Sequence, residues 1–445
     1  MIAIWALVAF IGTIVAWNAV LKRNIGEAML VGFIVVGAFA GRDAPRYMAN
    51  GFVDAIQAEI TFAALAFIFM SFILAKTPVL DRLIDILNSF LGRMKGGPIY
   101  TTTLAGAIFG AVAHVGASMA AVVGSVTVPW MKRSGVSGEL SATVVAGSAG
   151  MGLTFPFSAT MFILVGSATV SGMMDADDII VPLGIAGVWC LVYRLVLNFY
   201  LIRRNGLQPI AVEDRIPARR SLRAGWTSGL LLIPLLVPLF LTQGPIANAL
   251  GQYTDLVMSR AISIITWIPV LMILLVLFLG RRHLPRDGRG WWKILGESAP
   301  QFGIIGTTLV AAFSASAVLG QLRLPEQLTS MLESLAAPKW LMAILVGIII
   351  VVIAIPLTAS ATVATVGPVA VAALAGAGVP VPIAAAAVLV FASTEGSSPP
   401  SGAPIYIAAG IARIDPSKIF VPLLKYYCIP ILAIGVLIAL GLLPV

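Results

Sequence analysis

The chain contains few of the side chains that soluble proteins and enzymes depend on. Only 11% of its 445 residues are charged, whereas about 25% is typical of soluble domains. It has two histidines and two cysteines, and Cys190 and Cys428 lie in separate apolar runs. This spacing argues against a disulfide framework and against a metal site. So few titratable groups also leave no catalytic constellation for a membrane enzyme.

Apolar residues dominate instead. They make up 59% of the chain, and the mean hydropathy is +1.02. Many apolar runs reach the roughly 20 residues that span a hydrocarbon core, so we expect an all-α polytopic protein in a lipid bilayer, with about 10 transmembrane helices. The first run, residues 2–21, has no basic segment before it and no small-residue cleavage site, which favours a retained helix over a signal peptide.

Two stretches of the chain repeat each other at a distance of 243 residues. Sliding residues 121–158 onto 364–401 gives 12 identities in 38 columns. Alanine and valine matches arise partly from composition, so the others carry the information. They pair Gly124 with Gly367, Gly135 with Gly378, Pro156 with Pro399 and Ser158 with Ser401.

Basic residues are concentrated in two segments, which predicts the orientation. Six arginines lie within 203–223, and four arginines and one lysine lie within 281–293. Both segments should be cytoplasmic, and this placement explains the net charge of +9 without a nucleic-acid partner. The alternation predicts spans near 2–21, 26–41, 59–76, 138–170, 179–202, 224–242, 262–280, 297–320, 381–411 and 418–443, with both termini outside.

The chain is thereby divided into four regions. We expect N-terminal scaffold helices in 1–58, a first inverted repeat in 59–202, a basic cytoplasmic linker with two middle scaffold helices in 203–290, and a second inverted repeat in 291–445. Arg194 lies in an apolar run near a predicted cytoplasmic helix end, so we expect its side chain to snorkel to the interface.

Two uncharged stretches do not fit as ordinary spans. Residues 97–131 and 340–375 are each too long for one helix and too short for two full crossings. Each has a soft middle, at 114–118 and at 357–361, which predicts a re-entrant helical hairpin; a pair of tilted short helices is the alternative. Basic residues flank the first hairpin on both sides and only Lys339 flanks the second, so the two hairpins should open to opposite faces.

Each hairpin precedes a segment that is broken in its middle. Residues 138–170 are interrupted by glycine and proline at 150–158, and residues 381–411 by glycine, serine and proline at 393–402. Both residue types weaken a helix, and the freed backbone groups must line a cavity or be buried in protein. A single proline often produces only a kink. Two breaks at matching positions of a duplicated chain are instead typical of a secondary transporter.

His114 and Glu395 are the titratable side chains inside these uncharged segments. An ionisable group at membrane depth is costly and is a functional candidate. Glu395 is the only charged residue between 340 and 412. It can ligate a cation, carry a proton, or form hydrogen bonds with neighbouring backbone while protonated. For His114, a structural role near the hairpin tip and a role with substrate or protons stay equally open.

Several motifs resemble a known family. They are Gly124-Ser125-Val126-Thr127-Val128-Pro129, Pro156-Phe157-Ser158, Ser398-Pro399-Pro400-Ser401-Gly402 and Ile407-Ala408-Ala409-Gly410-Ile411-Ala412. With these motifs the chain resembles the large membrane subunit of TRAP (tripartite ATP-independent periplasmic) transporters, within the ion transporter superfamily. The resemblance is strongest over 59–202 and 291–443.

The resemblance implies Na⁺-coupled uptake of a small organic acid (a carboxylate) across the bacterial cytoplasmic (inner) membrane. A soluble periplasmic substrate-binding protein would deliver the substrate, and a small four-helix membrane subunit would complete the complex. Transport would follow an elevator mechanism. Phe157, Met119 and Thr358 stand where the family usually has a second proline and two acidic residues. These departures mark a divergent member.

The irregular backbone predicts two cation sites for Na⁺, with H⁺ as the alternative ion, and no organic cofactor. The first would join the first tip and break, through His114, Val115, Gly116, Ser118, Gly150, Gly152, Thr154 and Pro156. The second would use Thr358, Ser360, Ala361, Ser393, Glu395, Gly396, Ser397 and Pro399. The substrate should lie between the tips, near Ser118, Ser158, Thr358, Ser360, Ser398 and Ser401.

Two further readings of the same pattern stay open. A stand-alone ion-coupled organic anion transporter or a cation antiporter of the ion transporter superfamily would show the same repeats without a binding protein. The movement of the site is also open. An elevator would move 97–170 and 340–411 against a scaffold of 2–41 and 224–280, whereas a gating mechanism would keep the site fixed.

Overall fold

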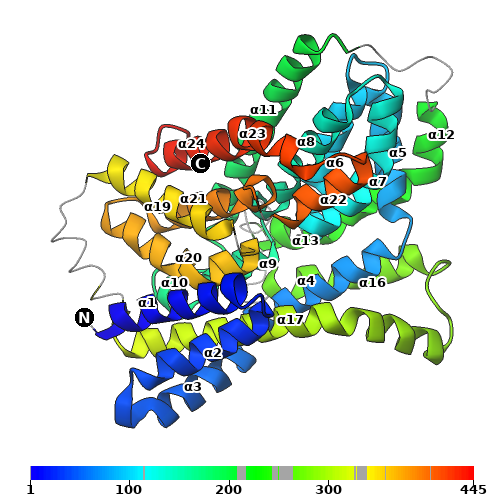
Figure 1. Cartoon of the computed structure of the whole chain (residues 1–445). Helices are drawn as coiled ribbons and strands as arrows, with labels where there is room; N and C mark the ends of the chain where they lie inside the picture. Colours follow the sequence, from blue (N-terminus) through cyan, green and yellow to red (C-terminus); the bar gives the residue numbers. More distant parts are fainter. Residues whose placement is uncertain are drawn as a thin grey trace.

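Helices joined by short turns build the protein. The computed structural model describes residues 2–113, 116–207, 217–242, 249, 264–324, 327, 338–355, 357–400 and 402–445, and these residues contain no strand (Figure 1). By length and composition, four described helices can cross a membrane: Ile180–Arg204, Phe302–Gln321, Ala359–Gly376 and Pro416–Ala439. A bent pair, Gly138–Thr154 with Ala159–Val165, gives a fifth. The all-α membrane fold expected from composition is confirmed.

The helices follow the chain in four groups. The first group is α1 (Ile2–Val15), α2 (Ile25–Ala38), α3 (Ala44–Gln57), α4 (Glu59–Ala75) and α5 (Val79–Leu91). The second is α6 (Gly97–Ala113), α7 (Gly116–Arg133), α8 (Gly138–Ala149), the 3₁₀ turn η3 (Gly150–Thr154), α9 (Ala159–Val165), α10 (Ala168–Ser171) and α11 (Ile180–Arg204). The third is α12 (Ala218–Gly225), α13 (Ile233–Thr242) and α16 (Ile264–Gly280). The last is α17 (Gly288–Gln321), α19 (Lys339–Ala354), α20 (Ala359–Gly376), α21 (Val381–Ala392), the 3₁₀ turn η6 (Ser393–Ser397), α22 (Ala403–Ala412), α23 (Phe420–Leu423) and α24 (Ile429–Ala439).

Two helices differ from the predicted spans. Helix α3 was not predicted, because its charged residues and its polar face exclude it from a search for uncharged runs. Helix α17 begins at Gly288, nine residues before the predicted start, because Asp287 caps it by accepting a hydrogen bond from the Gly290 N–H at 3.2 Å. Both differences concern polar helical turns that hydropathy does not detect.

The helices form two groups in space. In Figure 1, α1, α2, α3 and α17 lie together at the bottom, and α6 to α11 and α19 to α24 lie above them. Helix α17 packs along α2, α3 and α4, and α16 packs against α4. Contacts between the two groups include α4 with α9 and α17 with α20. The Ala168 N–H also donates to the Ser316 Oγ at 3.1 Å, which joins α10 to α17.

The sequence repeat extends to the backbone. Helices α7 and α20, helices α8 and α21, and the turns η3 and η6 have the same lengths and start 243 residues apart. The turn that follows the hairpin is also repeated. Gly135 and Gly378 have left-handed φ angles of 81° and 85°, and the next residue in each turn donates its N–H over 3.0 Å to the carbonyl of Met131 or Leu374. The duplication therefore preserves individual hydrogen bonds.

Each repeat packs against the other through its glycines. Helix α7 contacts α22, and α20 contacts α9. A Cβ added to Gly124 on α7 would lie 3.2 Å from Ile411 on α22, and one added to Gly367 on α20 would lie 2.8 Å from Leu164 on α9. Small residues allow such close helix crossings in membranes. The Lys132 Nζ also donates to the Ala412 carbonyl at the end of α22.

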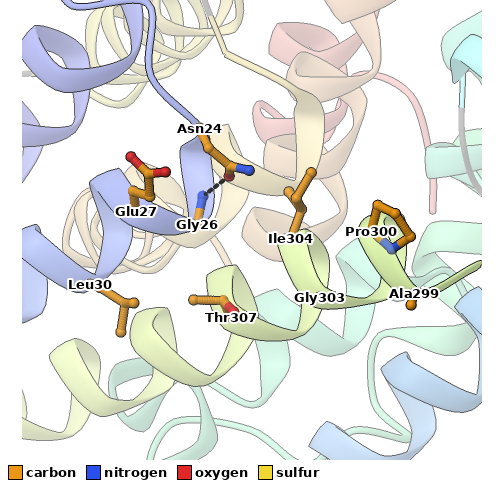
Figure 2. A pocket seen from close by; sticks show the side chains of 9 residues that line it. All are labelled: Asn24, Gly26, Glu27, Leu30, Ala299, Pro300, Gly303, Ile304 and Thr307. Atoms are coloured by element: carbon orange, nitrogen blue, oxygen red, sulfur yellow. Dashed lines mark hydrogen bonds between the residues drawn. The ribbon is translucent and has the colours of Figure 1, made fainter. Parts of the chain in front are cut away.

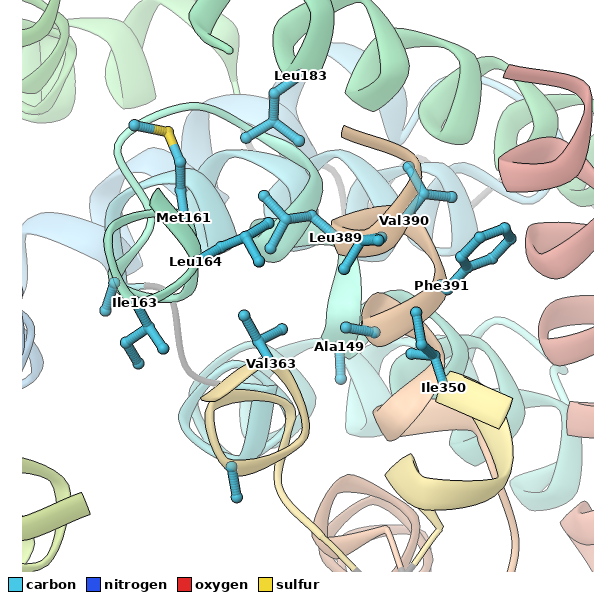
Figure 3. Packing of buried hydrophobic residues seen from close by; sticks show 14 of the residues in the cluster. Ala149, Met161, Ile163, Leu164, Leu183, Ile350, Val363, Leu389, Val390 and Phe391 are labelled. Carbon is cyan, nitrogen blue, oxygen red and sulfur yellow. The ribbon is translucent and has the colours of Figure 1, made fainter. Parts of the chain in front are cut away.

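The core lies where these crossings meet. Figure 3 shows Leu164 of α9, Val363 of α20 and Leu389 of α21 converging on one apolar cluster, and all three are at most 1% exposed. Phe391 is fully buried beside them, and glycines of α19 and α24 make room for its ring, since an added Cβ on Gly347 or Gly435 would approach it within 2.9 or 2.4 Å. The broken segments are thus held by tightly packed neighbours on several sides.

Candidate functional site

Both repeats contain an interrupted helix. Helix α8 ends at Ala149, continues as η3 and resumes as α9 after an extended stretch, with a bend of 45°. Helix α21 ends at Ala392, continues as η6 and resumes as α22. Phe157 in the first break has a φ of 66° although it is 2% exposed, and such a backbone is strained for a bulky residue. We call 150–158 the first break and 393–402 the second break.

The two breaks touch each other. A Cβ added to Gly150 would lie 1.8 Å from the Ser393 carbonyl oxygen, so only glycine fits there. A Cβ added to Gly396 would lie 3.0 Å from the Ala146 carbonyl oxygen at the end of α8. Gly150, Ser393 and Gly396 are all buried. Irregular backbone from both repeats therefore meets in the protein interior, where its polar groups need protein partners or a ligand.

Each hairpin tip lies beside the break of its own repeat. At the first tip, Gly116 faces the end of α8, because an added Cβ would be 3.3 Å from the Ala149 carbonyl oxygen. At the second tip, the Ala359 N–H lies within hydrogen-bonding reach of the Glu395 carboxylate. Gly116 and Ala359 occupy corresponding positions of the two repeats. His114, Val115 and Ser401 lie outside the described residues, and the side chain of Ser118 does too.

In the second break, hydroxyl groups donate hydrogen bonds to backbone carbonyls. Ser393, Thr394 and Ser397 donate to the carbonyls three residues earlier, at 2.6–3.0 Å, and are at most 2% exposed. In the first break, Thr154 donates to the Met151 carbonyl at 2.8 Å and is also fully buried. A hydroxyl that donates its proton still has lone pairs for a cation. Thr154, Ser393 and Ser397 are among the predicted ion residues, and the turns η3 and η6 that contain them are in contact.

The residues predicted for the substrate fall into two kinds. Ser158 is fully buried and its Oγ accepts the Met161 N–H at 3.1 Å, so it caps α9. Ser398 is 1% exposed and donates to the Thr394 carbonyl at 2.9 Å. Thr358 is exposed and caps α20 by accepting the Ala361 N–H, and Ser360 is half-buried beside it. Among the predicted substrate residues whose side chains the structure describes, those at the second tip are accessible.

Arg194 was expected to snorkel, and that expectation was wrong. The side chain is 1% exposed. Its Nε donates to the Gly147 carbonyl and its Nη1 to the Cys190 carbonyl, each at 3.2 Å. Helix α11 continues to Arg204, ten residues or about 15 Å beyond, which is farther than an arginine side chain reaches. The predicted span 179–202 already ended eight residues beyond Arg194, so the error was to treat that position as close to the helix end.

Charged groups outside the apolar segments pair at helix ends. Lys76 and Glu297 join α4 to α17 at 2.6 Å, and the hydrogen bond from Lys76 lowers the pKa of Glu297. Lys418 lies 3.4 Å from Glu139. In the loop before α11, burial and the carboxylates of Asp178 and Asp175 raise the pKa of Asp177. These ion pairs connect helices at the surface, and neither pair includes a residue of the two breaks.

Two open grooves lie away from the breaks. One of about 410 Å³ runs between α2 and α17 and is lined by residues that include Asn24, Glu27, Pro300 and Thr307 (Figure 2). Another of about 410 Å³ lies between α11 and the C-terminus, beside Trp189. Neither groove contains a residue of either break.

Duplicated hairpins and interrupted helices that meet in the interior define the class of the protein: a multi-pass membrane transporter. Residues 2–444 match the family described as the tripartite ATP-independent periplasmic transporter, DctM component. The chain belongs to this family, and the resemblance seen in its motifs is confirmed.

Relatives by sequence are distant. Protein YgiK of Salmonella typhimurium is 23% identical over 348 residues, which cover 78% of this chain and 74% of that protein. Protein y4mL of Sinorhizobium fredii is 29% identical over 249 residues, 54% of this chain and 56% of that protein, so the match spans only about half of that relative. The ectoine TRAP transporter large permease protein TeaC of Halomonas elongata is 25% identical over 179 residues, 39% of this chain and 41% of that protein.

Solved structures share the fold at low sequence identity. The YdaH transporter of Alcanivorax borkumensis superposes with a TM-score of 0.62 over 90% of this chain and 89% of that chain, at 15% identity. MtrF of Neisseria gonorrhoeae, described among antimetabolite efflux pumps, superposes with a TM-score of 0.62 over 89% of this chain and 83% of that chain, at 13% identity.

Proposed function

We propose that this protein is the large permease subunit of a Na⁺-coupled TRAP-type secondary transporter in the bacterial inner membrane. It imports a small carboxylate that a periplasmic binding protein delivers, and it works with a small four-helix membrane subunit. The observation that supports this most directly is the contact between the two breaks, at Gly150 and Ser393, in a chain of the DctM family. The binding protein, the small subunit, the ion and the substrate class are all parts of the proposal.

The coupling ion binds where a hairpin tip meets its break. Backbone carbonyls and hydroxyl oxygens are hard ligands that suit Na⁺, and unwound segments at membrane depth supply them without a dedicated acidic cage. The second break offers Glu395 in addition, beside the Ala359 N–H of the second tip. The two places are not equivalent, because the buried Arg194 donates to the end of the helix that precedes the first break.

The substrate binds at the tips, where Thr358 and Ser360 are accessible. No lysine or arginine occurs in 97–131, 150–158, 340–375 or 393–402, so a carboxylate there depends on helix N-termini, hydroxyls and the bound cation. Anion binding then requires the cation, which is a physical basis for coupling. Because TeaC is named as an ectoine permease, zwitterionic solutes belong among the candidate substrates.

Transport follows an elevator movement of 97–170 and 340–411 against the scaffold helices. Ala168 of the moving unit bonds to Ser316 of α17, which packs along the scaffold helix α2, and such contacts must break when the moving unit shifts. Cysteine pairs placed across this boundary should crosslink and stop transport, whereas pairs inside the moving unit should crosslink without effect. Transport that continues with boundary crosslinks in place would favour a fixed site with gates.

The function is tested by purifying the protein with its partners and measuring uptake in proteoliposomes. The expected result is uptake of a carboxylate that requires a binding protein and an inward Na⁺ gradient. Uptake that follows a proton gradient and ignores Na⁺ would refute the choice of ion. Uptake without a binding protein would instead favour a stand-alone carrier of the ion transporter superfamily.

A further inference from the structure

We propose that Arg194 is a positioning residue that acts as a built-in cation at the first break, so that the coupling ion binds at the second break. This inference rests on the proposed ion coupling and adds which repeat carries it. It begins from the burial of Arg194, which is 1% exposed at the middle of α11. Among the described residues, none of the ion pairs includes its guanidinium. Within the described part of the chain, the hydrogen-bond partners of this positive charge are carbonyl oxygens.

The Nε of Arg194 bonds to one of the last four carbonyls of α8. The last four carbonyls of a helix have no N–H partner within it, and together they carry partial negative charge that attracts cations. Gly147 is one of these four, because α8 ends at Ala149. The ring of Tyr427 covers Gly147 closely, since an added Cβ would lie 2.4 Å from it, and Tyr427 is fully buried. The packing thus shields this carbonyl from water, and Arg194 donates to it from α11.

In the second repeat, a neutral hydroxyl group donates to the corresponding carbonyl. The residue that corresponds to Gly147 is Val390, and its carbonyl accepts both the Ser393 hydroxyl, at 2.6 Å, and the Ser393 backbone N–H. In the first repeat, the residue that corresponds to Ser393 is Gly150, which has no side chain and cannot gain one because of the Ser393 carbonyl 1.8 Å from an added Cβ. Arginine therefore supplies from another helix the donor that serine supplies locally.

The two breaks consequently differ in their ionisable groups. The second break contains Glu395, and the corresponding residue of the first break is Gly152. A cation that approaches the first break meets Arg194 behind α8, whereas one that approaches the second break meets a carboxylate. Like charges repel strongly where water is scarce. The first break therefore keeps its shape without a bound ion, and the second break holds the ion that moves with the substrate.

Thermal unfolding of the purified protein tests this assignment. Native protein and the variants Arg194→Gln and Arg194→Lys are melted in Na⁺ and in N-methyl-D-glucamine at equal ionic strength. Arg204→Gln is the matched control, because Arg204 lies on the same helix with its side chain exposed. We expect the Arg194→Gln protein to melt well below native in N-methyl-D-glucamine and to regain most of the difference in Na⁺. Arg194→Lys should melt close to native without Na⁺, because lysine keeps the positive charge. Arg204→Gln should melt like the native protein in both solutions.

If the melting temperature of Arg194→Gln falls by the same amount with and without Na⁺, the proposal is overturned, because arginine would then only fill space. If this variant does not fold, Na⁺ binding to Thr154→Ala and Ser397→Ala decides, since these hydroxyls correspond between the repeats. Ser397→Ala should weaken Na⁺ binding about tenfold and Thr154→Ala less than about twofold; equal losses would overturn it. The proposed function is tested separately, by measuring uptake by the native protein in proteoliposomes.

Discussion

The two breaks have the same backbone plan and different chemistry. Both follow a helix of equal length, both begin with a five-residue 3₁₀ turn, and both lie beside the tip of their own hairpin. They differ at the corresponding pair Gly152 and Glu395, and at Phe157 and Pro400. Proline cannot adopt the φ of 66° found at Phe157, so the two backbones must also separate there. The duplication has preserved the backbone architecture, whereas the side chains at these two pairs of positions have diverged.

The largest expected effect comes from filling the point where the breaks touch. Gly150→Val should abolish folded protein, because its Cβ would lie 1.8 Å from a backbone oxygen that cannot move aside. We expect a loss of more than about 3 kcal/mol in the free energy of unfolding, measured by melting in detergent. Gly296→Ala on α17 is the control, because no atom lies within 4 Å of its added Cβ. Normal folding of Gly150→Val would show that the breaks do not touch.

A smaller effect on folding and a large effect on transport is expected for Glu395→Gln. The amide keeps an acceptor for the Ala359 N–H at the second tip and loses the negative charge. Uptake should lose its dependence on the Na⁺ gradient while the protein still melts within about 1–2 kcal/mol of native. Glu139→Gln provides the control, since Glu139 is exposed in its pair with Lys418. Unchanged Na⁺ dependence in Glu395→Gln would mean that the charge difference between the breaks has no role in coupling.

Removing the Ser393 hydroxyl should cost about 1–2 kcal/mol, because the buried Val390 carbonyl would lose the hydroxyl donor shown by this structure. The measurement is the melting temperature of Ser393→Ala. Ser125→Ala is its control, since Ser125 makes a comparable bond to the Val122 carbonyl in an exposed position. A loss in Ser393→Ala no larger than in this control would indicate that water reaches the second break and replaces the hydroxyl.

The smallest losses of stability are expected at the two corresponding glycines that follow the hairpins, and these losses should be nearly equal. Gly135→Ala and Gly378→Ala each place a side chain at a left-handed φ with open space around it, so only the backbone penalty of about 1–2 kcal/mol applies. The two variants should melt within about 0.5 kcal/mol of each other, whereas Gly410→Ala, a glycine on helix α22 with open space around it, should not destabilise. Unequal losses at 135 and 378 would show that the repeats differ even in their turns.

The class, the family and the helical fold could be predicted from the sequence, because hydropathy, charge placement and the matched glycines and prolines report on them directly. The burial of Arg194 could not, since its carbonyl partner Gly147 lies on another helix and no local pattern relates the two residues. Helix α3 was missed because it is polar on one face. The contact of Gly150 with Ser393 joins residues that no local pattern relates. The roles of the predicted ion and substrate residues stay predictions.

The exchange of partners between the repeats has a consequence for how the protein is made. Lys132 at the end of α7 bonds to Ala412 at the end of α22, which is 280 residues later. Ribosomes add about 5–20 residues per second, so α7 waits about 15–55 s for its partner to be synthesised. During that time its glycine-rich face is uncovered in the membrane. The first half of the chain therefore cannot complete its fold alone, and a chain truncated before α22 should be a substrate for membrane proteases.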